Sequence, residues 1–152
     1  MGQRASLIVE TEIEAPVDVV KSLFKDFASF KEWSTWSIDP AVSSKKVDDL
    51  LPQDKLSVNI EGLSFTATLL RNEPDVFEWA GGLQPLLLGE HMFSWRPSTK
   101  TPGGTTFIQN EKWRGLLTFL WKPNWFMGKK TRKSFEGFNA ELKKEAERRA
   151  AV

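Results

Sequence analysis

Hydrophobic and polar residues alternate near the N-terminus. In "SLIVETEIE", residues 6–14, one face carries Leu7, Val9, Thr11 and Ile13, and the other face is mostly glutamate. Successive side chains of a strand point to opposite faces of a sheet. The alternation therefore predicts a β-strand with one face in water.

The following segment has the period of an amphipathic helix. Pro16 suits its first turn, where a missing backbone N–H costs nothing. Apolar residues then recur at helical spacing, namely Val19, Val20, Leu23, Phe24 and Phe27. A second short helix is expected around residues 29–32.

The middle of the chain consists of short segments typical of strands. They cover residues 55–60, 64–70, 76–80, 89–97 and 105–113. Glu61 and Gly62 predict a tight turn between the first two segments, and the polar "STKTPGG" predicts a loop between the last two. "GGLQPLLLG", between the third and the fourth, predicts an apolar, glycine-rich loop.

A second apolar connection, "GLLTFLWKPNWFMG", breaks at Pro123, and a long helix is expected from about Asn124 to Arg149. The inward stripe of this helix consists of Thr131, Phe135, Phe138 and Leu142. A strand, two helices, a run of antiparallel strands and a final helix together predict an α+β fold. The final helix would cover the dry face of the sheet.

Length and charge narrow the possible partners. The 152 residues suggest a single domain over residues 1–152. With 21 Lys and Arg against 20 Asp and Glu, the net charge of +1 argues against a nucleic-acid partner. The basic "KKTRK", residues 129–133, is then the solvated face of the last helix. The lack of cysteine excludes disulfides and thiolate chemistry, and a single histidine leaves no recognisable set of metal ligands.

No apolar run is long enough to span a bilayer, and the N-terminus lacks the apolar centre of a signal peptide. We therefore expect a cytoplasmic protein, monomeric or homodimeric, without stable membrane insertion. Docking of residues 116–121 on a membrane surface is an alternative to their packing over the interior, which is favoured. The 11 Phe and 7 Trp can fill a core or line a cavity for a hydrophobic molecule.

The only histidine, His91, lies on an aromatic face of the predicted strand "GEHMFSWRP". If the next loop is centred near Thr101, His91 lies opposite Glu111, about 5 Å away between Cβ atoms. In this register Phe93 faces Gln109 and Trp95 faces Phe107. A slip of one residue would separate the two aromatic faces, so this register is favoured.

Two interpretations of the His91–Glu111 pair follow. Buried polar groups need partners, and each member of the pair can satisfy the other as a structural contact. Alternatively, the pair lies in a cavity and moves a proton to or from a ligand.

The chain resembles a known family in several segments that span nearly its whole length. They are "VETEIEAPVDVVKSLFKDFASFKEWSTW", "FEWAGG", "GEHMFSW", "TTFIQNEKWRGLL" and "FEGFNAELKKEAE". In this order they resemble the START-like (SRPBCC) superfamily, and within it the polyketide cyclase/dehydrase-like branch. The resemblance implies a helix-grip fold, in which a curved seven-stranded antiparallel sheet wraps around a long C-terminal helix.

The resemblance also implies an internal cavity for a hydrophobic ligand, with His91 and Glu111 pointing into it. An enzyme of polyketide-type secondary metabolism would use His91 as general acid and base, with Glu111 orienting it or acting as a second base, and no cofactor. The alternative is a carrier or sensor of a lipid or aromatic metabolite. The residues expected to contact the ligand are Trp79, Phe93, Trp95, Phe107, Gln109, Trp113, Thr131, Phe135 and Phe138.

Overall fold

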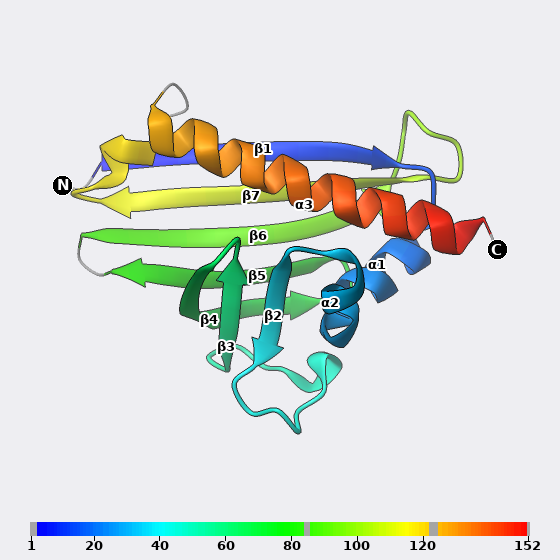
Figure 1. Cartoon of the computed structure of the whole chain (residues 1–152), viewed down its shortest axis with the longest axis horizontal. Helices are drawn as coiled ribbons and strands as arrows, with labels where there is room; N and C mark the ends of the chain where they lie inside the picture. The colour runs from blue at the N-terminus through cyan, green and yellow to red at the C-terminus, as the bar shows by residue number, and fades with distance from the viewer. Residues whose placement is uncertain (1–2, 84–85, 122–124, 152) are drawn as a thin grey trace.

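A computed structural model describes residues 3–83, 86–121 and 125–151. Seven antiparallel strands form one sheet in the order β1-β7-β6-β5-β4-β3-β2 (Figure 1). The strands are β1 (Gln3–Ile13), β2 (Trp36–Pro40), β3 (Lys55–Ile60), β4 (Leu63–Glu73), β5 (Val76–Leu83), β6 (Leu87–Pro97) and β7 (Thr105–Gly115). The helices are α1 (Val17–Lys25), α2 (Phe30–Trp33) and α3 (Phe126–Ala150), with 3-10 turns η1 (Phe27–Ser29), η2 (Val47–Asp49) and η3 (Thr118–Trp121).

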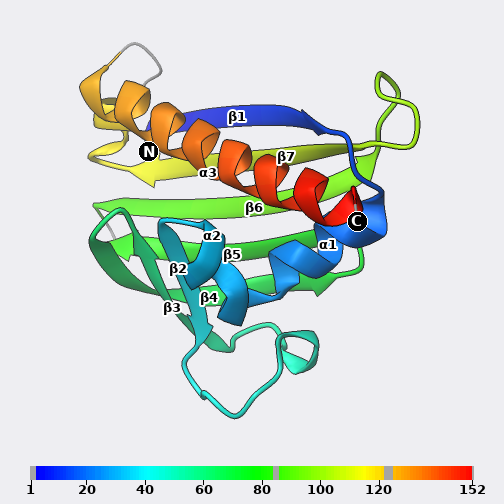
Figure 2. The ribbon, with the colours of Figure 1, turned by 45° about the vertical axis from the view of Figure 1, so that its right-hand side comes forward.

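The long helix α3 lies across one face of the sheet, and α1 and α2 cover the same face near its other edge (Figure 1). The sheet curves strongly, so that β2 and β3 come forward beside α3, as the turned view in Figure 2 shows. These features confirm the predicted α+β helix-grip fold, with two short helices after the first strand. Among the described residues, none of the helices is long and apolar enough to cross a bilayer.

The interior between the sheet and the helices is mostly aromatic. Phe24 of α1 is fully buried at its centre, and α3 contributes Phe135, Phe138 and Leu142 from the predicted stripe. The ring of Phe24 lies 4.8 Å from that of Phe93 and 5.4 Å from that of Trp95 between centroids. Such a core stabilises the fold through burial of large rings and through their edge and tilted contacts.

Three local predictions need correction or qualification. The expected loop "GGLQPLLLG" is shorter than predicted, because β5 continues to Leu83 and β6 begins at Leu87; residues 84–85 lie outside the described residues. The pairing of β5 with β6 continues through Gly81, Gly82 and Gly89. The strand β2 was not located by its own pattern, because five residues are too few to show a clear period. The predicted break at Pro123 and helix start at Asn124 also lie outside the described residues.

Candidate functional site

The predicted register of the last hairpin is confirmed. In the β6–β7 pair, His91 lies opposite Glu111, Phe93 opposite Gln109, and Trp95 opposite Phe107. Burial of the aromatic face fixes this register, because a one-residue slip would turn all these rings to solvent. The hairpin thus brings the only histidine and a carboxylate together on the inner face of the sheet.

A chain of hydrogen bonds leads inward from this pair. His91 Nδ1 lies 3.1 Å from Glu111 Oε2, and His91 Nε2 lies 2.8 Å from Gln109 Oε1. Gln109 Nε2 donates to the backbone carbonyl of Phe135 at 3.2 Å and to Asn139 Oδ1 at 2.7 Å. Asn139 Nδ2 in turn donates to Thr11 Oγ1 on β1 at 3.0 Å. We call Glu111, His91, Gln109 and Asn139 the polar relay.

The geometry of the polar relay determines where its protons lie. A backbone carbonyl can only accept, so the Gln109 atom that faces Phe135 must be the amide nitrogen. The amide oxygen of Gln109 therefore faces His91, and His91 Nε2 must carry a proton. On the other side of the ring, His91 Nδ1 and Glu111 Oε2 form a close histidine–carboxylate contact.

The two members of the pair differ in their access to solvent. The His91 side chain is 2% exposed, and both of its ring nitrogens already face a partner, whereas the Glu111 side chain is 15% exposed. A molecule approaching the pair would therefore meet the Glu111 carboxylate first. The roles expected from the sequence, His91 as general acid and base with Glu111 orienting it or acting as a second base, stay a prediction.

Gly89 makes room for the Glu111 carboxylate. A Cβ atom added at Gly89 would lie 2.5 Å from Glu111 Oε1 and 3.2 Å from the indole of Trp113. Real Cβ atoms do not come this close to another heavy atom, so the carboxylate occupies the space that the glycine leaves open. The sequence pattern placed this glycine where the apolar loop joins the His91 strand and showed no role for it.

We expect Gly89→Ala to displace the Glu111 carboxylate from His91 Nδ1. Because His91 is the only histidine, ring ¹⁵N NMR of histidine-labelled protein reports on it alone, and the Nδ1 resonance should change while Nε2 remains protonated. Gly137→Ala on α3 is the control, since its added Cβ would meet nothing within 4 Å. An unchanged Nδ1 resonance in Gly89→Ala would show that the carboxylate does not depend on this space.

The expected ligand-contacting residues fall into separate groups. Trp79, Phe93 and Phe135 surround His91, with ring centroids 5.1, 4.3 and 4.6 Å from the imidazole. Trp95 and Phe107 instead pack with Phe24 toward the α1 end of the interior. Gln109 belongs to the polar relay. The other three are Trp113, whose ring lies 6.3 Å from that of Trp121, Phe138, which stacks on Trp36, and Thr131, whose hydroxyl donates to the Met127 carbonyl of its own helix.

Sequence reasoning missed Asn139 and Gly89 and left the place of Trp36 open. Trp36 is buried 6.2 Å from the His91 ring between centroids, and its indole N–H has no hydrogen-bond partner among the described residues. Asn139 follows Phe135 by four residues, so helical periodicity could have shown that it lies beside the inward stripe. A buried N–H without a partner is costly, so Trp36 marks a place where an oxygen atom would be stabilised.

The chemistry available in the interior is that of carboxylate, imidazole, amide and indole groups. Within residues 3–83, 86–121 and 125–151, no three His, Asp or Glu side chains come together as a possible metal site. The arrangement can therefore exchange a proton at Glu111, donate hydrogen bonds to an oxygen, and stack against a flat apolar molecule.

No family model and no curated protein sequence matches this chain. Solved structures do match its architecture. A hypothetical protein of Helicobacter pylori is 10% identical with a TM-score of 0.67, over 95% of this chain and 88% of the other. A START superfamily protein of Mycobacterium smegmatis is 19% identical with a TM-score of 0.57, over 96% and 97%.

The chain has a START-like fold. A putative uncharacterized protein of Rhizobium leguminosarum shares it as well, at 15% identity and a TM-score of 0.64, over 97% of both chains. At these identities the likeness is one of backbone architecture. The START-like fold places the polar relay between the sheet and α3, and the chemistry of that relay has to be argued from its own residues.

Proposed function

We propose that this protein binds a hydrophobic polycyclic or polyketide-like molecule between the sheet and α3 and catalyses its cyclisation or dehydration without a cofactor. The proposal rests on one observation, the close contact between Glu111 Oε2 and His91 Nδ1, 3.1 Å apart, in an otherwise aromatic interior. The resemblance of the sequence to polyketide cyclase/dehydrase-like proteins supports the same chemistry. Binding without reaction, as a carrier or sensor, is the alternative.

An ionisable pair is an expensive element in an apolar core. Removing two charged groups from water costs several kcal/mol per ion, which their mutual attraction and further hydrogen bonds only partly offset. Gln109 and Asn139 supply these further bonds, and they connect the pair to α3 and β1. A function that requires proton transfer would explain why the His91–Glu111 pair is kept in the apolar core.

Glu111 is the group that we expect to react with the substrate. As a carboxylate it can take a proton from the carbon next to a substrate carbonyl. The pair can then return a proton to a hydroxyl group that leaves as water, so that protons balance over the reaction. His91 acts through Glu111 as a positioning residue. The Trp36 N–H, which has no partner in the part of the chain that the structure describes, offers a hydrogen bond to a substrate oxygen.

The experiment that tests this proposal starts with mass spectrometry of small molecules released from the denatured, purified protein. Candidate polycyclic ketones and linear polyketones are then added to the native protein. A product that has lost water, or that elutes differently at constant mass, supports dehydration or cyclisation. Glu111→Gln should lower the rate of product formation by about 10²-fold or more, the usual contribution of a general acid or base.

The control for Glu111→Gln is Glu10→Gln, the same change at an exposed position of β1. This variant should retain the wild-type rate. Retention of an unmodified molecule by wild type and Glu111→Gln alike would favour the carrier. Binding of none of the apolar molecules, together with an empty protein after purification, would overturn both interpretations.

A further inference from the structure

One end of the molecule carries several exposed apolar side chains. They are Leu86, Leu116, Trp125 and Phe126, with exposed fractions of 42%, 65%, 49% and 75%. They come from the residue before β6, the connection after β7 and the start of α3, which all lie at the left-hand end of the molecule in Figure 1. We call these four residues the apolar tip. Single exposed hydrophobic residues are common, but a group of them marks a contact surface.

The parts of the apolar tip are held together by contacts within the protein. The backbone N–H of Leu117 donates to the Leu86 carbonyl at 2.9 Å, which joins the start of β6 to the segment after β7. The rings of Phe119 in η3 and Trp125 lie 5.9 Å apart between centroids. Contacts between segments that are distant in sequence therefore form the apolar tip.

Positive charge flanks the apolar tip on the helix side. Lys129, Lys130, Arg132 and Lys133 lie on the first turns of α3, directly after the tip, and all four side chains are exposed. The net charge of the whole chain is only +1. These four cations therefore form a local basic cluster on a chain that is nearly neutral as a whole.

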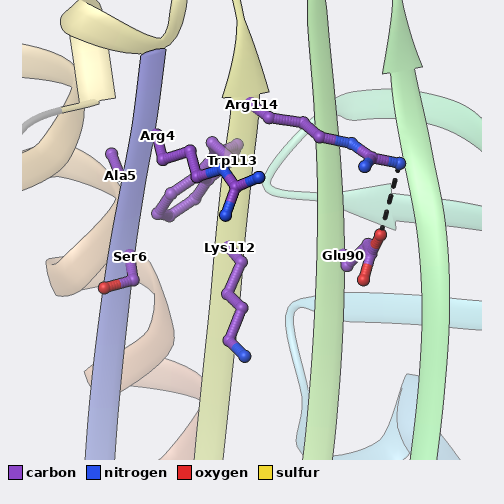
Figure 3. A pocket seen from close by; sticks show the side chains of 7 residues that line it. All are labelled: Arg4, Ala5, Ser6, Glu90, Lys112, Trp113 and Arg114. Atoms are coloured by element: carbon purple, nitrogen blue, oxygen red, sulfur yellow. Dashed lines mark ion pairs between the residues drawn. The ribbon is translucent and has the colours of Figure 1, made fainter. Parts of the chain in front are cut away.

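A second cationic group flanks the tip on the sheet side. Arg4, Lys112 and Arg114 project from β1 and β7 on the face turned away from α3, where they line a hollow of about 470 Å³ (Figure 3). Arg4 and Arg114 lie directly opposite each other across the two strands, an arrangement that costs stability. Glu90, 3.6 Å from Arg114, is the acidic residue that lines the same hollow.

We propose that this end of the protein docks on the surface of an anionic lipid bilayer. An apolar tip with an indole side chain suits the boundary between lipid headgroups and acyl chains. The flanking Lys and Arg side chains suit the phosphate and carboxylate groups of anionic lipids. The proposal is independent of any reaction at Glu111.

Two other occupants fit this surface less well. A second copy of the chain, related by a two-fold axis through the tip, would bring the same cations of both copies together. A nucleic acid would use the cations but leave the four aliphatic and aromatic side chains without a role, and the chain as a whole is nearly neutral. An anionic bilayer uses both features at once.

Vesicle flotation of the purified full chain tests the proposal. Vesicles of phosphatidylcholine alone are compared with vesicles that also contain phosphatidylserine. Wild type should float with the phosphatidylserine vesicles, and raised salt should weaken this binding because it screens the exposed charges. We expect Trp125→Ser/Phe126→Ser, and separately Lys129→Glu/Lys130→Glu, to lower the bound fraction at least about tenfold.

Matched controls lie far from the tip. Val42→Ser/Leu51→Ser changes two exposed apolar residues of the β2–β3 connection, and Lys31→Glu/Lys144→Glu changes two exposed lysines elsewhere. Both should bind vesicles as wild type does, with unchanged circular dichroism in all four variants. Absence of flotation with anionic vesicles, equal binding to both vesicle types, or wild-type binding by either tip variant would overturn the proposal.

Discussion

Phe24→Ala should lower the free energy of unfolding by about 4 kcal/mol, the upper part of the range for removal of a buried phenyl ring. Phe24 has no exposed surface. Its ring lies within 6.3 Å, between centroids, of rings from α1–α2, the sheet and α3, among them Phe77, Phe107 and Phe138. No single neighbour can fill the space, because each is held by its own ring contacts.

Urea denaturation followed by tryptophan fluorescence measures this loss. Phe126→Ala is the control, because its side chain is 75% exposed and its removal should change the unfolding free energy by less than about 0.5 kcal/mol. A loss below about 1 kcal/mol in Phe24→Ala would show that the interior repacks readily. The aromatic side chains of the interior would then shift readily to fill the space and would not form a rigidly packed core.

Gln109→Leu should lower the free energy of unfolding by about 3 kcal/mol, because it leaves several buried polar groups without partners. Leucine cannot accept the proton of His91 Nε2, and it cannot donate to Asn139 Oδ1 or to the Phe135 carbonyl. Gln109 is fully buried, so water cannot replace these bonds without opening the interior. The loss of stability comes from the polar atoms of His91, Asn139 and Phe135, which stay buried without their Gln109 partner.

Asn110→Leu is the matched control for Gln109→Leu. Asn110 is the next residue on β7, points to the other face of the sheet, and has a side-chain oxygen without a partner among the described residues. Its replacement should change the unfolding free energy by less than about 0.5 kcal/mol. Ring ¹⁵N NMR of His91 adds a second measurement, since the signals of a proton on Nε2 should change in Gln109→Leu alone. Equal losses in the two variants would contradict the polar relay.

The hairpin that holds the candidate site could be predicted well from the sequence. Alternation in "GEHMFSW" and "TTFIQNEKW" assigned the inner faces, and the loop between them set the register, so that His91, Glu111 and Gln109 were found together. The reason is that strand pairing across a short loop depends on local period and on burial of one face. The apolar stripe of the last helix was predictable for the same reason.

Other parts of the site depended on contacts between distant segments. Asn139 reaches Gln109 only because α3 lies over β7 at a particular rotation, and no periodic pattern shows which amide will meet which. The division of the aromatic residues was also unpredictable. Trp36 from a five-residue strand comes to lie near His91, whereas Trp95 packs with Phe24.

The sequence by itself determined the α+β class, the inward face of each long element and the pairing of His91 with Glu111. Each of these depends on the period of the chain and on removal of apolar side chains from water, both of which act locally. Only the tertiary structure decided which member of the pair meets solvent, the space that Gly89 leaves for the carboxylate, and the apolar tip between two cationic flanks. These depend on how the curved sheet and α3 meet, because ångström-scale contacts between distant segments are set by packing and not by sequence period.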